Sequence, residues 1–239
     1  MSISGARKPR LATEYGIASG GTESDITVSG VSYKLHTFTA TGTLSVTQPG
    51  WFDVLVVGGG GGGYAPSSTF FVGGGGGGWS QSTLYLSANQ TITVGAGGAT
   101  GSSITGGASS VGSLFVVGGG GSCDSAHDVG LCGASTSGVR TAPGTTRNFV
   151  IGHGTGGSNV YQAGCGAGGI STGSTVGGAG KDVSGFIGGS TLYKSVGGVA
   201  NAATAGGANT GDGGKGVDGG GSTSSAGGSG VVIVRVRTA

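Results

Sequence analysis

The sequence Asp53-Val54-Leu55-Val56-Val57 runs directly into six consecutive glycines, Gly58 to Gly63, and this junction decides the fold. A short run of branched apolar residues bounded by glycine is typical of a buried β-strand. The glycines that follow offer no side chain with which to build a core. The junction has two counterparts, at Phe70-Phe71-Val72 before Gly73 to Gly78 and at Leu114-Phe115-Val116-Val117 before Gly118 to Gly121.

The composition of the chain argues against disorder in spite of its glycine content. Glycine makes up 63 of the 239 residues, proline only 4, and charged residues 8%. Residues 54–123 contain no Asp, Glu, Lys or Arg. Disordered segments are usually rich in charge and proline, so this stretch must satisfy its backbone groups internally. Collagen is excluded because glycine does not recur strictly at every third position.

Several classes of protein do not fit the charge and hydropathy pattern. The longest uninterrupted runs of branched apolar residues, such as Val54 to Val57, have four residues, whereas a membrane-spanning helix needs about 20, so we expect no membrane insertion. Residues 1–10 are basic but lead into no apolar segment, and we therefore expect no signal peptide. The net charge is +2 without a basic stripe that alternates with aromatic residues, so we expect no nucleic-acid partner.

The distribution of residue types divides the chain into two parts. Residues 1–24 hold several charged side chains and no apolar periodicity, which is typical of a solvated, flexible terminus. The functional alternative, which we adopt, is an N-terminal attachment arm that docks onto a larger assembly. Residues 25–239 form a second part, the glycine-rich domain, with β-branched and aromatic residues in strand-like patterns. We expect strands at 26–28, 31–39, 43–47, 51–57 and 231–236, and a hairpin formed by 83–86 and 91–94.

The expected fold class is all-β with almost no α-helix. A β-strand framework, sandwich-like, clamps a glycine-rich core of polyglycine II-type helices. In such a left-handed helix, with three residues per turn, the N–H and C=O groups point outward. Neighbouring glycine segments can pair these groups because no side chain prevents their approach. The structural glycine tracts are bounded by Gly58, Gly63, Gly73, Gly78, Gly118 and Gly121.

The first glycine tract satisfies the pattern G-x-G-x-x-G after a strand, which is the beginning of a dinucleotide-binding motif. The remainder of the motif is missing. No helix pattern follows Gly63, and the first acidic residue after Asp53 is Asp124, far beyond the expected 20 or so positions. We therefore expect no cofactor, and a flavin or nicotinamide enzyme remains a minor alternative.

The remaining chemical groups do not form a catalytic motif. Cys123, Asp124, His127, Asp128 and Cys132 lie close together in sequence, but their spacing matches no standard zinc site. The alternatives are a polar loop with free thiols or a local disulfide between the two cysteines. No nucleophile motif and no paired carboxylates occur, so we predict that the protein is not an enzyme, with no catalytic and no metal-binding residues.

The composition shifts between Ser122 and Tyr161, which is the least repetitive part of the second half. Loops on a rigid scaffold commonly carry binding residues. The predicted receptor contacts are Asp124, His127, Asp128, Arg140, Arg147, His153, Asn159 and Tyr161. The aromatic residues that border the glycine tracts are expected to pack over them, and Tyr64 and Tyr161 have a second possible role in stacking against a sugar.

Two segments resemble a known family. Residues 33–44, Tyr-Lys-Leu-His-Thr-Phe-Thr-Ala-Thr-Gly-Thr-Leu, and residues 49–58, Pro-Gly-Trp-Phe-Asp-Val-Leu-Val-Val-Gly, are similar to the glycine-rich domain of bacteriophage tail fibre and receptor-binding (adhesin) proteins. The ending Gly228-Ser229-Gly230-Val231-Val232-Ile233-Val234-Arg235 resembles the closing strand of that family. The resemblance covers the chain from about Asp25 to its end.

The resemblance implies a virion structural protein, located in the phage tail or on the particle surface and made in the host cytoplasm. Residues 1–24 would bind other virion proteins, and the loops would bind a host surface receptor, a polysaccharide or an outer-membrane protein. The family also implies a homotrimer and polyglycine-type packing. The alternative is a capsid decoration or head-fibre protein without receptor binding.

Overall fold

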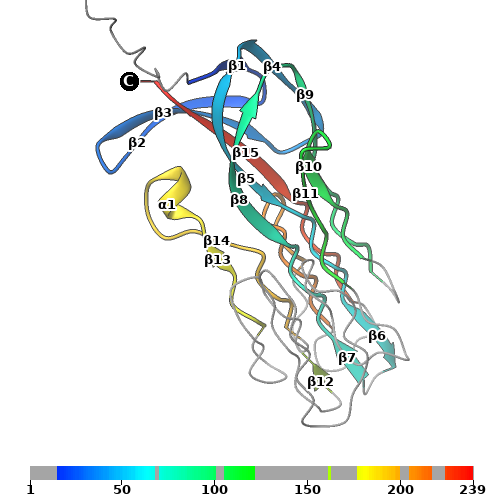
Figure 1. Ribbon diagram of the computed structural model, residues 1–239. Coiled ribbons are helices and arrows are strands. Elements are labelled where there is room, and N and C mark those ends of the chain that lie inside the picture. Colours follow the sequence, from blue (N-terminus) through cyan, green and yellow to red (C-terminus); the bar gives the residue numbers. More distant parts are fainter. Residues whose placement is uncertain are drawn as a thin grey trace, which may run out of the picture.

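The computed structural model describes residues 15–67, 70–100, 105–121, 161–162, 177–199, 205–216 and 224–238. These residues form an elongated molecule with sheets at one end and glycine segments that run lengthwise toward the other (Figure 1). The architecture is nearly all β, as predicted. None of the described residues forms a helix with the length and apolar character that a membrane crossing requires.

Two antiparallel five-stranded sheets make the framework. The first has the order β2 (Thr22–Val28), β3 (Val31–Phe38), β15 (Val231–Arg237), β5 (Gly50–Val57) and β8 (Trp79–Leu86). The second has the order β1 (Ile17–Ser19), β4 (Gly42–Gln48), β9 (Gln90–Thr93), β10 (Ser109–Val111) and β11 (Phe115–Val117). The strand at the end of the sequence therefore closes the centre of the first sheet, with Val232 opposite both Phe38 and Val56.

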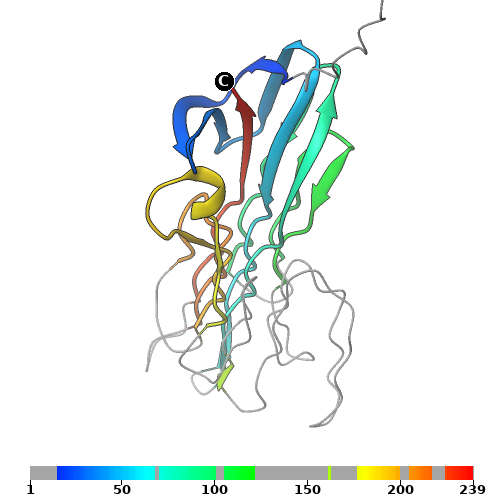
Figure 2. The same ribbon diagram turned by 60° about the vertical axis from the view of Figure 1, so that its left-hand side comes forward.

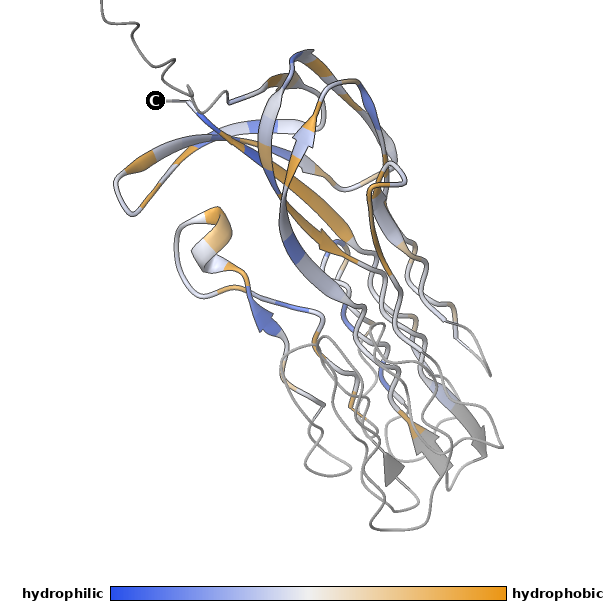
Figure 3. Ribbon diagram, viewed as in Figure 1, coloured by the Kyte–Doolittle hydropathy of each residue, from blue (hydrophilic) through white to orange (hydrophobic). Residues whose placement is uncertain are grey.

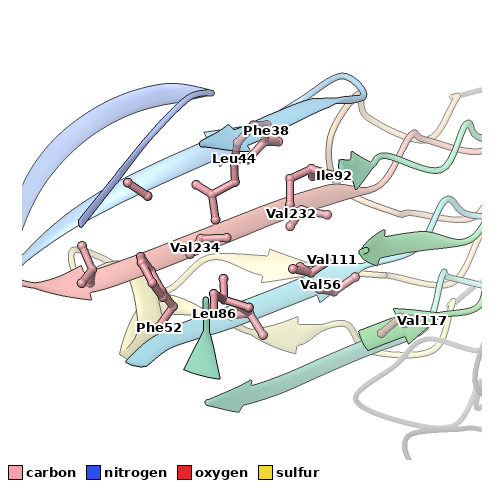
Figure 4. Packing of buried hydrophobic residues seen from close by; sticks show 13 residues of the cluster. Phe38, Leu44, Phe52, Val56, Leu86, Ile92, Val111, Val117, Val232 and Val234 are labelled. Atoms are coloured by element: carbon pink, nitrogen blue, oxygen red, sulfur yellow. The ribbon is translucent and has the colours of Figure 1, made fainter. Parts of the chain in front are cut away.

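The main hydrophobic core lies between these two sheets (Figure 4). Period-two alternation places every second residue of a strand on one face. Val232, Val234 and Val236 thus face the core together. The second sheet contributes Ala18, Leu44, Ile92, Val111 and Val117. Hydrophobic residues are concentrated in these strands, whereas the glycine segments are nearly neutral in hydropathy (Figure 3).

The predicted hairpin of residues 83–86 and 91–94 is wrong. β8 pairs with β5 in the first sheet, and β9 pairs with β4 and β10 in the second. The connection between β8 and β9 therefore crosses from one sheet to the other. Leu86 and Ile92 reach the same core from opposite sides, and this burial outweighs local strand pairing.

The outer face of the first sheet carries a smaller core beneath α1 (Ser184–Ile187), the one helix among the described residues. Phe186 packs there with Leu35, Leu55 and Ile233. Arg235 holds the helix in place, because its Nη1 donates to the Phe186 carbonyl at 2.7 Å and its Nε donates to Asp53 Oδ2 at 3.0 Å. Its guanidinium lies over the rings of both Tyr33 and Phe186.

Short strands complete the molecule. β6 (Tyr64–Ser67), β7 (Phe70–Val72) and β12 (Tyr161–Gln162) form a three-stranded sheet at the end of the glycine segments. β13 (Lys181–Asp182) and β14 (Tyr193–Lys194) form a hairpin that carries α1.

The sequence analysis placed residues 1–24 in an attachment arm, and the structure describes 15–24 of these. They include β1, which pairs with β4, and the beginning of β2. Residues 15–24 are thus integrated in the sheets. The attachment role remains a prediction, and a clean test of it must leave these ten residues in place.

Candidate functional site

The strands of both sheets continue into glycine segments without a break in direction (Figure 1). β5 continues into Gly58 to Gly63, and Gly73 to Gly78 lead into β8. The segments around β9, β10, β11 and β15 behave in the same way. We call the region in which these segments lie side by side the glycine bundle. It is defined by residues 58–63, 73–78, 95–99, 106–107, 118–121, 211–216 and 225–230.

The segment 58–63 lies at the centre of the glycine bundle. Its N–H groups donate to three neighbouring segments in turn. Gly58 and Gly61 donate to Gly78 and Gly75, Gly60 and Gly63 donate to Gly228 and Ser225, and Gly59 donates to Gly107, with N···O distances of 2.8–2.9 Å. Residues three apart therefore contact the same neighbour.

The carbonyl groups of the same segment accept from three further neighbours. Gly59 O accepts from Gly120, Gly60 O from Gly98 and Gly61 O from Gly214, at 2.7–2.8 Å. Six segments thus surround residues 58–63, and each is joined to them by a direct backbone hydrogen bond. These hydrogen bonds give buried backbone N–H and C=O groups their partners, as we expected for a glycine-rich stretch without charged residues.

No other residue type fits at the centre of the bundle. A Cβ added to Gly60 would overlap the Asp212 carbonyl, and one added to Gly61 would overlap the Gly121 carbonyl. These overlaps show the same spacing of three residues. An added Cβ would overlap the carbonyl of residue 118 or 121 at Gly58 or Gly61, of residue 96 or 99 at Gly59 or Gly62, and of residue 212 or 215 at Gly60 or Gly63. Glycine is required here for close approach of the backbones.

The glycine bundle differs from the sandwich in how its two layers meet. Facing β-sheets stand about 10 Å apart because side chains from both fill the space between them. In the bundle, Gly59 from the first layer and Gly107 from the second form a direct hydrogen bond of 2.9 Å. The two layers therefore come closer together where glycine replaces residues with side chains, and backbone hydrogen bonds join them directly.

The nucleotide-like pattern at residues 53–63 has a structural role. The N–H groups of Gly58, Gly59, Gly60, Gly61 and Gly63 donate to other backbone carbonyls and are not available to a phosphate. Asp53 accepts from Arg235 and from Thr83 Oγ1, at 3.0 and 2.7 Å. β6 follows the tract where a nucleotide site would need a helix.

The end of the glycine bundle remote from the two sheets is the candidate functional site, and we call it the distal tip. β6, β7 and β12 lie at this end (Figure 2). The segment 122–160 begins after Gly121, whose carbonyl accepts from Gly75 at 2.9 Å, and returns at Tyr161, which pairs with Phe71. Gly121 and Tyr161 therefore both contact one short stretch of chain, residues 71–75.

The opposite end of the molecule holds the first and last described residues. Tyr15 forms a bridge to Trp51 at the start of β5, and Thr238 N donates to Ser32 O at 3.0 Å next to the β2–β3 turn. The glycine bundle separates these positions from the distal tip (Figure 1). The two ends of the long axis therefore differ, and we call this difference the polarity of the molecule.

Most of the predicted receptor contacts fall outside the described residues. These are Asp124, His127, Asp128, Arg140, Arg147, His153 and Asn159. Tyr161 lies in β12 at the distal tip, and its backbone alone is described. Cys123, Cys132 and Cys165 also fall outside. Within the described ranges, no group of His, Cys, Asp and Glu side chains is arranged to hold a metal ion.

Asp182 joins the two ends of the segment 183–192, which includes α1. Asp182 Oδ1 accepts from the backbone N–H groups of Ser184 and Leu192 at 2.9 and 3.2 Å, and Oδ2 accepts from Ser184 Oγ at 3.0 Å. The hydrogen bonds from Ser184 and Leu192 lower the pKa of Asp182 below its ordinary value. Lys194 at the other end of the hairpin donates to Asn209 O at 2.8 Å, and burial lowers its pKa.

The sequence analysis missed one exposed feature. Trp51 and Tyr85 face each other across β5 and β8 with their ring centroids 5.4 Å apart, and 46% and 47% of their surfaces are exposed. The sequence drew attention to the aromatic residues beside the glycine tracts. Of these, Trp79 is half-buried against the smaller core and lies beneath Lys181. Its packing over the glycine tract remains a prediction.

Comparison with known families gives one match. A family model described as a glycine-rich domain matches residues 39–237, a range that includes the glycine bundle and most of both sheets. No curated protein matches the chain.

Proposed function

Since the chain belongs to the glycine-rich domain family, we propose that it is a bacteriophage virion protein, a tail fibre that attaches by its N-terminus and presents loops to a host receptor. The family match by itself assigns no function. The tail-fibre role comes from the resemblance of residues 33–44, 49–58 and 228–235 to fibre and adhesin proteins, together with the polarity of the molecule.

The observation that carries the proposal is the separation of the two ends. The chain enters the sheets at Tyr15, at one end, and the polar segment 122–160 starts and finishes at the other, beside residues 71–75. The glycine bundle between them is joined by backbone hydrogen bonds in several directions. A fibre needs this design, because attachment at one end must leave the recognition loops accessible at the other.

We also infer that the segments of the glycine bundle are polyglycine II-type helices. Such a helix has three residues per turn and no internal hydrogen bonds. A β-strand would bring residues two apart to the same neighbour. The spacing of three between Gly58 and Gly61, and between Gly60 and Gly63, supports the helix.

The proposed partner at the distal tip is a host surface polysaccharide or outer-membrane protein, contacted by residues 122–161. A competition assay tests this role. The purified protein should reduce adsorption of the corresponding phage to host cells in proportion to its concentration.

A matched variant replaces residues 122–160 by a Gly-Ser linker of about eight residues, which is long enough to join Gly121 to Tyr161 across the tip. It should keep the thermal midpoint of the sandwich and lose the competition. Full competition by this variant would exclude receptor binding through the loops. Incorporation into particles together with no competition by the wild type would favour the capsid decoration or head-fibre role.

A further inference from the structure

An exposed aromatic pair lies at the end of the molecule where the chain enters the sheets. Trp51 and Tyr85 meet edge to face, with 72° between their ring planes, and about half of each residue is accessible. At the core of protein interfaces, large aromatic residues are enriched and charged residues are depleted. Ile17, 54% exposed, adds an apolar side chain near the same entry point.

The pair adjoins residues 1–14. Tyr15, the first described residue, forms a backbone bridge to Trp51, and Gln48 Nε2 donates to the Tyr15 carbonyl at 3.1 Å. Because residues 1–14 join the described chain at Tyr15, a protein that binds them is tethered within about 50 Å of Trp51.

The strand that carries Tyr85 is an edge strand of its sheet in the described part of the chain. Within the described part of the chain, β8 pairs with β5 alone and is the last strand of its sheet. Its sequence, Trp-Ser-Gln-Ser-Thr-Leu-Tyr-Leu, contains no charge and no proline. Proteins usually protect a long edge strand by such residues. The opposite edge of the same sheet, β2, carries Glu23 and Asp25.

We propose that Ile17, Trp51, Tyr85 and the edge of β8 form a docking surface for the virion protein to which residues 1–14 attach. That partner adds an extended, uncharged strand to β8 and places an apolar side chain on the Trp51–Tyr85 pair. Backbone hydrogen bonds would supply affinity, and the aromatic pair would supply specificity. The inference rests on the proposed function, since it requires a particle to which the fibre attaches.

The test measures incorporation into phage particles, in cells that supply the chain from a plasmid to a phage that lacks its own copy. Trp51→Ala/Tyr85→Ala and, separately, Gln81→Lys on the exposed face of β8 should each reduce incorporation at least about tenfold, the loss typical of interface hot spots. Leu114→Ala/Val116→Ala, at exposed apolar positions near β11, and Thr27→Lys on β2 are the matched controls. Far-ultraviolet circular dichroism and the thermal midpoint establish that each variant is folded.

Incorporation of the folded aromatic and β8 variants at the wild-type level would overturn the docking surface and leave the proposed function intact. Absence of the wild type from particles would overturn both proposals. Loss of receptor competition with normal incorporation would count against the proposed function alone.

Two solution measurements separate the partner from other occupants of the surface. In a Trp79→Phe background, acrylamide quenching of Trp51 should be equal in residues 1–239 and 15–239. Weaker quenching in the longer chain would mean that residues 1–14 cover the pair, and would overturn the proposal. Self-association that Gln81→Lys abolishes would place a second copy on β8 and overturn it as well.

Discussion

At the scale of single residues, the glycines of the bundle are defined by what surrounds them. Gly60 donates to Gly228, accepts from Gly98, and has the Asp212 carbonyl where a Cβ would stand. The sequence predicted that glycines allow close backbone contact. It did not predict which carbonyl blocks which position, because these neighbours come from distant parts of the chain.

Gly60→Ala is expected to lower the free energy of unfolding by about 3 kcal/mol, the upper end of the usual range for overpacking, because the methyl group meets backbone atoms that cannot move aside. Chemical denaturation measures the change. Gly185→Ala in α1 is the matched control, since nothing lies within 4 Å of a Cβ at that position. The control should be neutral or stabilising by about 0.5–1 kcal/mol. Equal effects of the two substitutions would contradict the close packing of residues 58–63.

Asp182 should make the segment 183–192 sensitive to acid. Its folded-state pKa is lowered, so its hydrogen bonds contribute fully above the pKa of the unfolded chain and are lost as pH falls through the folded pKa. Hydrogen exchange should therefore show that protection of the Leu192 amide decreases below about pH 4. Asp182→Ala should reduce this protection several-fold already at pH 7.

Asp25→Ala is the control for this prediction, because the Asp25 side chain is 79% exposed and forms an ion pair with Lys34. It should leave protection at Leu192 unchanged. Unaltered protection in Asp182→Ala would show that the segment is held by other contacts.

At the scale of elements, period-two patterns located the strands well. The predicted segments 31–39, 43–47, 51–57 and 231–236 correspond closely to β3, β4, β5 and β15, whereas the predicted segment 26–28 covers only the last three residues of β2. The predicted pairing of 83–86 with 91–94 was wrong, because a short connection can join two strands of one sheet or carry the chain to the facing sheet. Local sequence does not distinguish a hairpin from a connection between the sheets. Burial of Leu86 and Ile92 in a shared core favours the connection between the sheets.

The three-residue spacing predicts how the glycine bundle responds to insertions. In the proposed polyglycine II-type helix, one extra glycine between Gly61 and Gly62 would rotate the following residues by a third of a turn, so that Gly63 would no longer face Ser225. Three extra glycines restore the phase. We therefore expect the thermal midpoint to fall more with one inserted residue than with three.

Insertion of two glycines distinguishes the helix from a β-strand, since two residues would keep the phase of a strand. A smaller effect of two residues than of three would contradict polyglycine II geometry. A single glycine inserted beside Gly189, where a Cβ would meet nothing within 4 Å, is the control and should have little effect.

At the scale of the whole molecule, residues 15–24 belong to the sheets. Ala18 lies in the main core, His36 Nδ1 lies 3.1 Å from the Gly20 carbonyl, and Arg237 donates to the Tyr15 hydroxyl at 3.0 Å. These contacts join residues 15–24 to both sheets. The boundary of the sheets therefore lies before the boundary at residue 24 that composition indicates.

Removal of residues 1–14 should leave the thermal midpoint within a few degrees of the wild type. Removal of residues 1–24 should lower it by roughly 10 °C or more, since about 2–4 °C corresponds to each kcal/mol in a domain of this size. Differential scanning calorimetry compares the two truncations. Equal midpoints would mean that β1 and the start of β2 add no stability to the sheets.

The sequence by itself determined the β class, the position of most strands and the need for direct pairing between glycine backbones. These properties follow from alternation, composition and the absence of side chains, which are local. The tertiary structure alone decided that residues 58–63 lie at the centre of six neighbours and that β8 and β9 belong to different sheets. It also decided that the candidate loops start and finish at the distal tip. The composition of a glycine tract does not indicate which other tracts it pairs with. The order of the strands in the two sheets determines which tracts lie side by side.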